Sequence, residues 1–284
     1  MSQAGEAPRS IRDALYEEPG PKMRRRIRIG TAGAAVVVAA LAVLIVRQFW
    51  ITGQLDEGYW AFFTWPSTWA FLFSGFRGTL SVSLVAAAIA LVLGFLLMLG
   101  RISAPRPIAA ICRVATDFFR GVPSLLLIYF FFLVVPQYGI KLPAFWMITL
   151  PVALGASGVL AEVLRAGINA VPAGQTEAAL SIGMRPFRAL MLIVVPQGVR
   201  YVIPSLISQL VVVVKDTTLA YVVSYPDLLQ NGRVLITNYD ALVSTYFVIA
   251  VIYILLNYAI NHVAVTMARR SGQERADDLA ASAL

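Results

Sequence analysis

Long apolar runs recur along the chain and are separated by short polar segments. Residues 30–46 and 78–100 carry no charged side chain, and helices of such lengths cross the hydrocarbon core of a bilayer. Further spans are predicted at residues 124–135, 142–161, 201–226 and 241–268. The pattern predicts an all-α membrane protein with six transmembrane helices, in which Pro123 kinks the start of the third and polar residues interrupt the fifth.

The polar segments set the expected domain boundaries. Residues 1–28 end in a basic cluster and predict a flexible cytoplasmic tail, followed by an added, uncleaved N-terminal transmembrane helix at residues 29–50. Residues 51–76 are rich in aromatic side chains and poor in positive charge, which is typical of an outer loop at the membrane interface. Residues 70–270 are expected to form the main transmembrane domain, and residues 271–284 a second cytoplasmic tail.

The positions of the basic residues predict the orientation in the membrane. With six spans, most of the 23 Lys and Arg residues lie on the side of the N-terminus, among them Arg101, Arg106 and Arg113 in a predicted turn. Segments on the cytoplasmic side carry an excess of such residues, so both termini and the polar segment 171–196 are expected in the bacterial cytoplasm. The net charge of +8 then reflects topology and not nucleic-acid binding.

Composition excludes several classes of protein. With 59% hydrophobic and 13% charged residues, the chain is too apolar for a soluble protein of this length, and membrane lipid is its expected environment. One cysteine, Cys112, excludes a disulfide within the chain, and with one histidine, His262, it cannot form an ordinary Cys/His metal cluster. The sequence has no G-x-x-x-x-G-K-[ST] phosphate loop and no evident nucleophile with its base. We therefore expect neither an enzyme nor a bound cofactor, and ATP chemistry would belong to a partner.

Residues 171–196 form a polar stretch between two predicted spans. Pro172 suits the first turn of a helix, Gly183 suits a C-terminal cap, and Pro186 prevents that helix from continuing. We expect a short surface helix, a turn and a second short helix.

The same stretch resembles the EAA loop of ABC-importer permeases, written E-A-A-x3-G-x9-I-x-L-P, with Val195 in place of Leu. The resemblance implies a cytoplasmic coupling helix that sits in a groove of an ATPase subunit. Small side chains there would let two backbones approach closely, and a carboxylate can meet a helix N-terminus or a basic group. The matching residues are Glu177, Ala178, Ala179, Gly183, Ile193 and Pro196.

Further motifs resemble the polar amino-acid uptake branch of these permeases: F-R-G-V-P at 119–123, A-E-V-L-R-A-G at 161–167, V-P-Q at 195–197 and V-K-D-T-T-L at 214–219. The resemblance implies a type I ABC importer permease bundle with a five-helix core, to which the N-terminal helix is an addition. It also implies two ATPase subunits, a second permease subunit and an extracytoplasmic solute-binding protein. We expect the second permease to be a related but different chain. The preferred substrate is glutamate or another polar amino acid, partly because the overall sequence resembles glutamate-system permeases with a long basic N-terminus.

Ionisable and hydroxyl groups at membrane depth are candidates for the solute path. Charged side chains within a span are costly and usually face a cavity or an opposite charge. Lys215 could meet a carboxylate of the solute, or Lys215 and Asp216 could neutralise each other or pair with another helix. Glu162 and Arg165 lie three residues apart and could form a structural ion pair instead. The candidates are Glu162, Arg165, Lys215, Asp216, Thr217 and Thr218.

The sequence is also compatible with two other classes of membrane protein. An ion-coupled secondary transporter would use Glu162, Lys215 or Asp216 as coupling groups and would work without an ATPase. A membrane scaffold would need only the packing surfaces of its helices. The spacing of the EAA-like residues favours the ABC permease, for which closure of the ATPases would drive alternating access through the coupling helix.

Overall fold

The structure is a computed structural model that describes the backbone of residues 20–282 and the side chains of residues 20–263, 265 and 266. Most of the predicted N-terminal tail, residues 1–19, lies outside this range, as do residues 283 and 284 of the predicted C-terminal tail. The regular structure of the described part is helical. The chain divides into two units, Met1–Asp56 and Glu57–Leu284, and each is described by itself.

The first unit holds one long helix, α2 (Pro21–Ile51), which contains the predicted N-terminal span. It has the length and composition of a transmembrane helix. α2 begins earlier than predicted, so the basic cluster between Lys22 and Arg28 lies on its first turns and not in a flexible tail. Proline suits the first turn of a helix, and Lys and Arg have high helix propensity, which together explain the earlier start.

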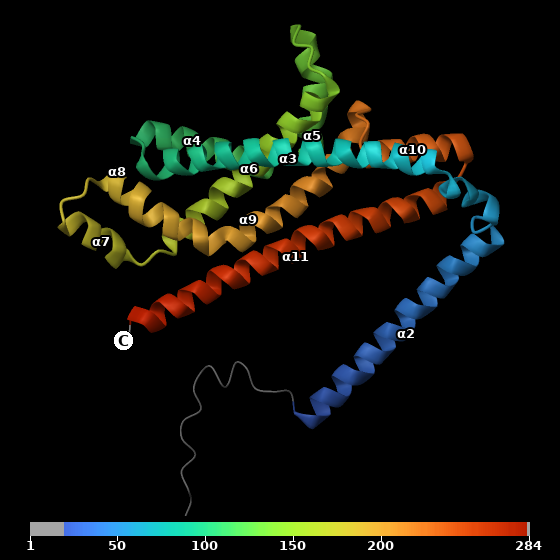
Figure 1. The fold of residues 1–284 in the computed structure, drawn as a ribbon, viewed down its shortest axis with the longest axis horizontal. Coiled ribbons are helices and arrows are strands. Elements are labelled where there is room, and N and C mark those ends of the chain that lie inside the picture. The colour runs from blue at the N-terminus through green and yellow to red at the C-terminus, as the bar shows by residue number, and fades with distance from the viewer. Residues whose placement is uncertain (1–19, 283–284) are drawn as a thin grey trace, which may run out of the picture. The chain divides into compact units, whose positions relative to one another are not determined.

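The second unit is a bundle around α6 (Ala144–Asn169), which packs between α3 (Pro66–Ser103) and α9 (Val195–Thr217) (Figure 1). α11 (Leu242–Ser282) lies along α9. The other helices are α4 (Arg106–Gly121), α5 (Ser124–Tyr129), α7 (Ala173–Ser181), α8 (Pro186–Ala189) and α10 (Leu228–Tyr239).

Four stretches of this unit are long and apolar enough to cross a membrane: Pro66–Ser103, Ala144–Asn169, Pro186–Val223 and Leu242–Val263. α4 and α5 together form one further candidate span with a bend of 100° between them. With α2, the described part of the chain therefore has five candidate spans, and six, as the sequence predicts, when α4 and α5 are counted as one bent span.

Small side chains bring α3 and α6 into close contact. A Cβ added to Gly94 of α3 would lie 2.9 Å from the Cβ of Leu160 on α6. Ala86 and Ala90 on α3 and Ala153 on α6 have no exposed surface. Close approach through small residues is a common way for membrane helices to associate, because lipid provides no hydrophobic drive.

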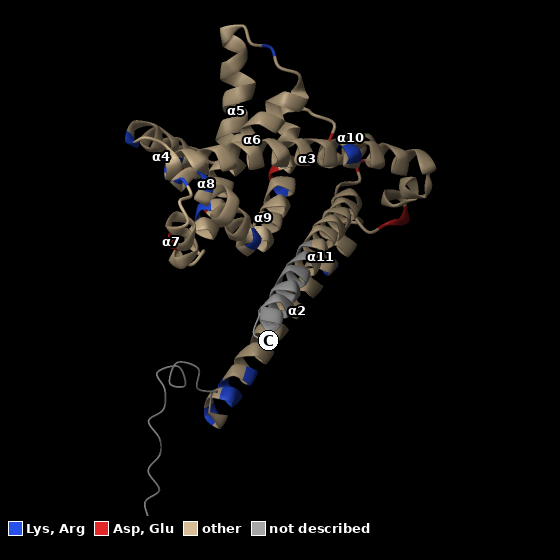
Figure 2. Cartoon of the chain, turned by 60° about the vertical axis from the view of Figure 1, so that its left-hand side comes forward, with Lys and Arg blue, Asp and Glu red and all other residues tan. Residues whose placement is uncertain are grey.

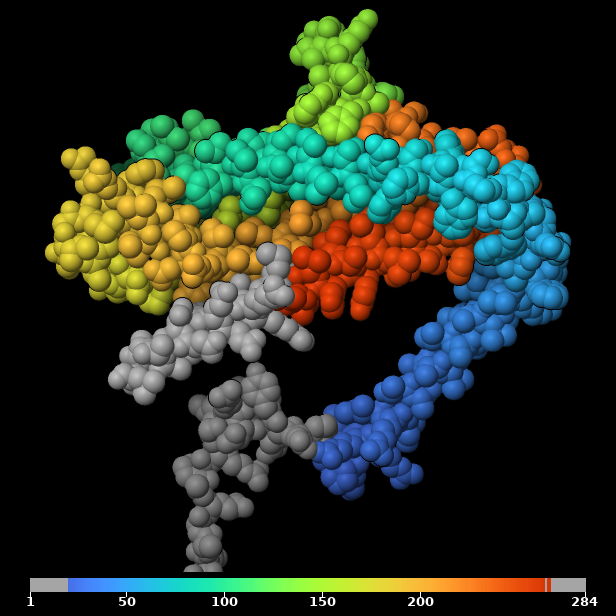
Figure 3. All heavy atoms as spheres, in the orientation of Figure 1, coloured from blue at the N-terminus to red at the C-terminus, as the bar shows by residue number. Residues whose placement is uncertain are grey.

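α5 and the segment after it, up to residue 143, project from the rest of the unit (Figure 3). Val122 and Pro123 separate α4 from α5, so the predicted kink at Pro123 lies between two helices. Large apolar side chains on the projection are exposed, and they are Leu126, Phe130, Leu133 and Tyr138.

α3 begins inside the segment that was predicted to be an outer loop. Its first residue is Pro66, so residues 66–76 are helical and the loop prediction is wrong there. The hydroxyl of Thr68 donates to the carbonyl of Phe62 at 2.7 Å, and the indole of Trp69 donates to that of Phe63 at 2.7 Å. These bonds fold the aromatic segment back onto the start of the helix, whose first-turn proline favours that start.

Two helices occur where none was predicted. Arg106 and Arg113, which the sequence analysis places in a turn, lie on α4. The second of these helices, α10, follows the fifth span. The arginines of α4 are spaced seven residues apart, so they lie on one face of the helix. In the sequence, the same spacing distributes charge along the whole segment. α10 starts at Asp227, whose carboxylate accepts a hydrogen bond from the backbone N–H of Gln230 at 2.7 Å and caps the helix.

Candidate functional site

The EAA-like segment forms a helix and a turn at one end of the bundle. α7 starts after Pro172 and ends in a Schellman motif, with the N–H of Gly183 bonded to the carbonyl of Leu180 and the N–H of Met184 to that of Ala179. Gly183 has a φ of +84°, a conformation that favours glycine. The predicted cap at Gly183 is therefore confirmed, and a second helix does start at Pro186, as the first turn of the long stretch Pro186–Val223.

The matched residues divide between the surface and the interior of this loop. Glu177 and Ala178 are exposed on α7, and Pro196 is exposed near the start of α9. Ala179 is buried and Ile193 is half-buried, so these two serve the fold of the loop. Exposed apolar side chains lie beside the exposed residues, and they are Leu180, Ile182 and Phe187. Such a patch is typical of a surface that contacts a partner.

A polar contact ties α7 to the bundle. The side-chain amide of Gln197 on α9 donates to the Oε1 atom of Gln175 on α7 at 3.1 Å. α6 leads into α7, and α8 leads into α9 through a π-helical turn at Leu190–Val194. Movement of α7 would therefore be transmitted to both α6 and α9.

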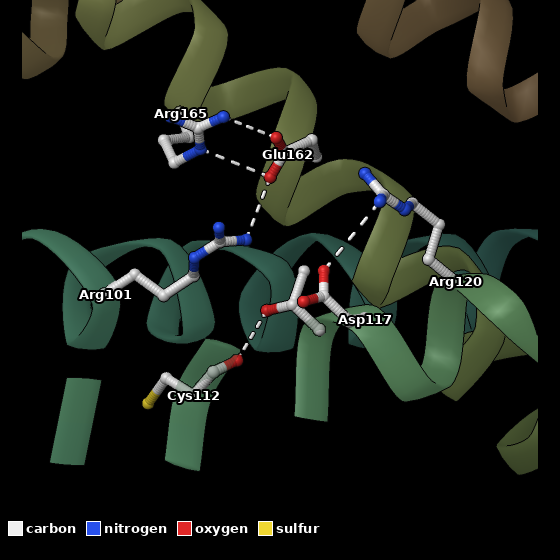
Figure 4. Close-up of polar contacts among 7 residues, drawn as sticks. Arg101, Cys112, Asp117, Arg120, Glu162 and Arg165 are labelled. Carbon is white, nitrogen blue, oxygen red and sulfur yellow. Dashed lines mark hydrogen bonds and ion pairs between the residues drawn. The ribbon is translucent and has the colours of Figure 1, made fainter. Parts of the chain in front are cut away.

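Glu162 on α6 lies between two arginines (Figure 4). Arg165 of the same helix binds it through two nitrogens, and the guanidinium of Arg101 on α3 lies 2.9 Å from its Oε2 atom. The sequence predicted the contact with Arg165 but not the one with Arg101, because Arg101 is distant in sequence. Asp117 and Arg120 of α4, 3.8 Å apart, lie next to this group.

The polar segment at the end of α9 is only partly available to a solute. The hydroxyl of Ser124 donates to Asp216 Oδ2 at 2.7 Å. Thr217 is fully buried, and its hydroxyl lies 3.3 Å from that of Ser83 on α3. Lys215 is exposed, and no ion pair joins it to Asp216 within the described residues. Neutralisation of Lys215 by Asp216 is thus not what the structure shows.

Thr218 marks the change from α-helix to a 3-10 helix that ends at Val223. Its hydroxyl donates to the carbonyl of Lys215 at 2.6 Å. The interruption that the sequence predicted in the fifth span is therefore this change of helix type. Ser124, the partner of Asp216, was missed, since nothing in its own segment indicates a contact with residues so far along the chain.

A buried polar cluster, which sequence analysis did not predict, joins α3 to the start of α10. The backbone N–H of Leu228 donates to the hydroxyl of Thr79 at 3.1 Å, and the amide of Asn231 donates to the carbonyl of Phe71 at 2.8 Å. Asp227 has no exposed surface. Burial raises its pKa to about 6, and hydrogen bonds from backbone N–H groups only partly oppose this rise.

A metal centre finds no support in the described part of the chain, where no group of three His, Cys, Asp or Glu side chains could hold an ion. Cys112 is a free, half-buried thiol on α4 that packs against Gly100 of α3. The arrangement offers a surface loop, charged groups inside the bundle and helices that can move together, which are the components of a transport path.

Comparison with known proteins agrees with these features. Residues 90–272 match the family described as binding-protein-dependent transport system inner membrane component. The chain is 34% identical to the glutamate transport system permease protein GluD of Corynebacterium glutamicum, over 78% of this chain and 84% of that relative. It is 32% identical to the probable glutamine ABC transporter permease protein GlnP of Bacillus subtilis, over 71% of this chain and 92% of that relative.

Solved structures show the same fold. A crystal structure of an amino acid ABC transporter with histidines is 27% identical, with a TM-score of 0.69 over 74% of this chain and 98% of that chain. An inward-facing structure of the MetNI methionine ABC transporter shares the fold at 18% identity, with a TM-score of 0.61 over 73% of this chain and 99% of that chain.

Proposed function

The chain belongs to the family of inner membrane components of binding-protein-dependent transport systems, and from this membership we infer that it is the permease subunit of an ATP-driven amino-acid importer. Subunits of this family are membrane permeases and not enzymes. The observation that carries the inference is the capped helix α7, with the exposed residues Glu177 and Ala178, in a loop that matches the EAA pattern.

The partners follow from this assignment. An ATPase is implied by the family, and we propose that two ATPase subunits each receive a coupling loop, one of them α7 of this chain. The exposed apolar residues Leu180, Ile182 and Phe187 support such a contact. The exposed apolar side chains on α5 and the segment after it support contact with a second permease subunit, which we propose to be a related but different chain. A solute-binding protein would deliver the amino acid from outside.

The proposed mechanism is alternating access. Closure of the ATPases on ATP would displace α7, and the chain connections to α6 and α9 would pass this displacement to the spans. The hydrogen bond between Gln175 and Gln197 supports a coupled movement of α7 and α9. The orientation proposed for this cycle has both termini and α7 in the cytoplasm, which agrees with the basic residues on α4 and α8 at that end (Figure 2).

Glutamate is the proposed substrate. The relative GluD is a glutamate permease, and the relative GltK of Escherichia coli is a glutamate/aspartate import permease with 31% identity over 60% of this chain. Lys215 is an exposed cation at the end of α9 and could bind a carboxylate of the solute. Asp216 and Thr217 would hold this segment in place through Ser124 and Ser83.

Affinity purification of this chain from its native membrane, followed by mass spectrometry, tests the assignment. We expect an ATPase and a second permease to be recovered with it in stoichiometric amounts, and a solute-binding protein whose ligand is glutamate. Recovery of the intact chain without any ATPase, from membranes in which the ATPase is expressed, would contradict the proposal. An Ile182→Glu variant serves as the internal control, because it should be inserted normally yet recover less ATPase.

A further inference from the structure

α4 carries a stripe of charged side chains that the proposed function uses only as support for the orientation in the membrane. The basic stripe consists of Arg106, Arg113 and Arg120, which are seven residues apart and lie on one face of the helix, together with Asp117. All four side chains are exposed. The neighbouring face of α4 carries exposed apolar side chains, at Ile108, Ile111, Val114 and Phe118.

The stripe extends along α4 from the end of the bundle near α7 toward the middle of α6. α4 packs along the half of α3 that is nearest α7 and α8 (Figure 1). At its far end, a Cβ added to Gly158 of α6 would lie 2.8 Å from the backbone nitrogen of Arg120, and Gly158 lies near the middle of α6. Arg106 and Arg120 are separated by about 21 Å of helix rise, a length equal to roughly two thirds of the hydrocarbon thickness of a bilayer.

The positive charge of the stripe is offset only at Arg120, which lies beside Asp117 and next to the Glu162 group. Arg120 has Asp117 at 3.8 Å, a distant and exposed ion pair. Arg106 and Arg113 have no ion pair with a described acidic side chain. Lipid cannot solvate such charges at depth, so they must face water or an anion.

The stripe continues the charged segment of α9. Ser124 lies four residues after Arg120, at the start of α5, and its hydroxyl donates to Asp216, the neighbour of Lys215. From the exposed Lys215 to Arg106, the cations of α9 and α4 therefore extend toward the end of the bundle that carries α7. A line of like charges along a water-filled path raises the local concentration of ions of the opposite sign.

We propose that the basic stripe lines the inner half of the translocation path and conducts an anionic amino acid from the region of Lys215 to the cytoplasmic exit. This inference rests on the proposed function and deepens it, because it identifies the acidic class of substrate from this chain's own charges. Arg113 is the central residue of the stripe, and the rate of import should depend on the charge of the side chain at this position.

The test uses the complex purified through this chain and reconstituted with its binding protein in vesicles of neutral phospholipid. ATP-driven glutamate import is measured for wild type and for Arg113→Lys, Arg113→Gln and Arg113→Glu. Arg77→Gln is the matched control, because Arg77 is an exposed arginine of α3 outside the stripe. We expect the maximal rate to be unchanged for Arg113→Lys and for the control, to fall about threefold for Arg113→Gln and to fall about tenfold for Arg113→Glu, at equal recovery of the complex.

The outcomes separate this inference from the function on which it rests. Equal glutamate rates in wild type and Arg113→Glu would overturn the stripe as a path while leaving the importer intact. A wild type that imports only neutral or cationic amino acids would overturn it as well. Failure of the wild type to import any amino acid on ATP would instead contradict the proposed function. The measurements are repeated with phosphatidylglycerol in the vesicles, and an effect of Arg113 that occurs only then would assign the stripe to lipid binding and overturn the proposal.

Discussion

Gly167 of α6 and Gly198 of α9 are in direct backbone contact. A Cβ added to Gly198 would lie 3.0 Å from the carbonyl oxygen of Gly167, and a Cβ on Gly167 would approach the carbonyl oxygen of Gly198 even more closely. The two glycines flank the loop that contains α7. Because backbone atoms cannot move aside as a flexible side chain can, this crossing fixes the two helices that carry the coupling loop.

Substitution of Gly167 should therefore destabilise the bundle. We expect Gly167→Ala to lower the free energy of unfolding by about 1–3 kcal/mol, the usual cost of overpacking. Thermal unfolding of the purified chain in detergent measures the effect. Gly174→Ala on α7 is the matched control, because a Cβ there has nothing within 4 Å, and it should leave the unfolding temperature unchanged or raise it. An unchanged unfolding temperature for Gly167→Ala would show that α6 and α9 can move apart at this contact without loss of stability.

Gly183→Asp should uncouple ATP hydrolysis from transport. The φ of +84° strains most residues with a Cβ, and the charge of the aspartate would lie on the exposed turn after α7. We expect normal membrane insertion, continued ATP hydrolysis by the complex and loss of most amino-acid import. Gly183→Asn is the control, since asparagine tolerates the left-handed conformation without a charge. Import at the wild-type rate in Gly183→Asp would remove Gly183 from the coupling mechanism.

Lys215→Ala should impair uptake more than assembly. Lys215 is exposed and has no ion pair with a described acidic residue, so its loss leaves no buried charge behind. We expect at least about a tenfold loss of glutamate import, equivalent to roughly 1.4 kcal/mol, with normal recovery of the complex. Lys215→Arg should restore part of the rate. An alanine variant with unchanged apparent affinity and rate would show that Lys215 does not contact the solute.

Asp227 should make the stability of the bundle depend on pH. Its pKa is about 6 in the folded protein and near 3.8 when it is exposed on unfolding, so the folded state binds the proton more tightly. The resulting stabilisation is complete below about pH 4, declines between about pH 4 and 6 and is lost at higher pH. Its size is at most about 3 kcal/mol, since each unit of pKa difference is worth about 1.4 kcal/mol.

Asp227→Asn isolates this contribution. Asparagine retains an oxygen that can accept the hydrogen bond from Gln230 and is an equally good helix cap. The difference in unfolding temperature between wild type and Asp227→Asn should therefore change between pH 4 and pH 7, with the wild type losing relative stability as pH rises. Parallel curves for the two proteins across this range would show that Asp227 does not titrate there.

Much of the fold could be predicted from the sequence, because apolar runs and prolines act locally. The spans and the cap at Gly183 follow from residues close together in the chain, and the structure has them. α4 and the start of α3 were missed for a physical reason. A sequence with charge on one face of a helix, or with aromatic residues at its first turn, resembles the sequence of a loop. The two cases can be told apart only when the packing partner of the segment is known.

The site was less predictable because its contacts join distant segments. Glu162 and Arg165 could be paired from their spacing, but Arg101 and Ser124 reach their partners only through the tertiary fold. Ala179 was expected to face a partner and is buried instead, since the sequence of a nine-residue helix does not show which side packs against the bundle.

The most direct test of the central claim is the energy source of transport. The complex purified through this chain is reconstituted in vesicles with its binding protein, and uptake of labelled glutamate is measured with ATP alone and with a proton or sodium gradient alone. Uptake that requires ATP hydrolysis and the binding protein, and that no ion gradient supports, is the predicted result. Uptake driven by an ion gradient without ATP would contradict the coupling role of α7 and identify the chain as a secondary transporter.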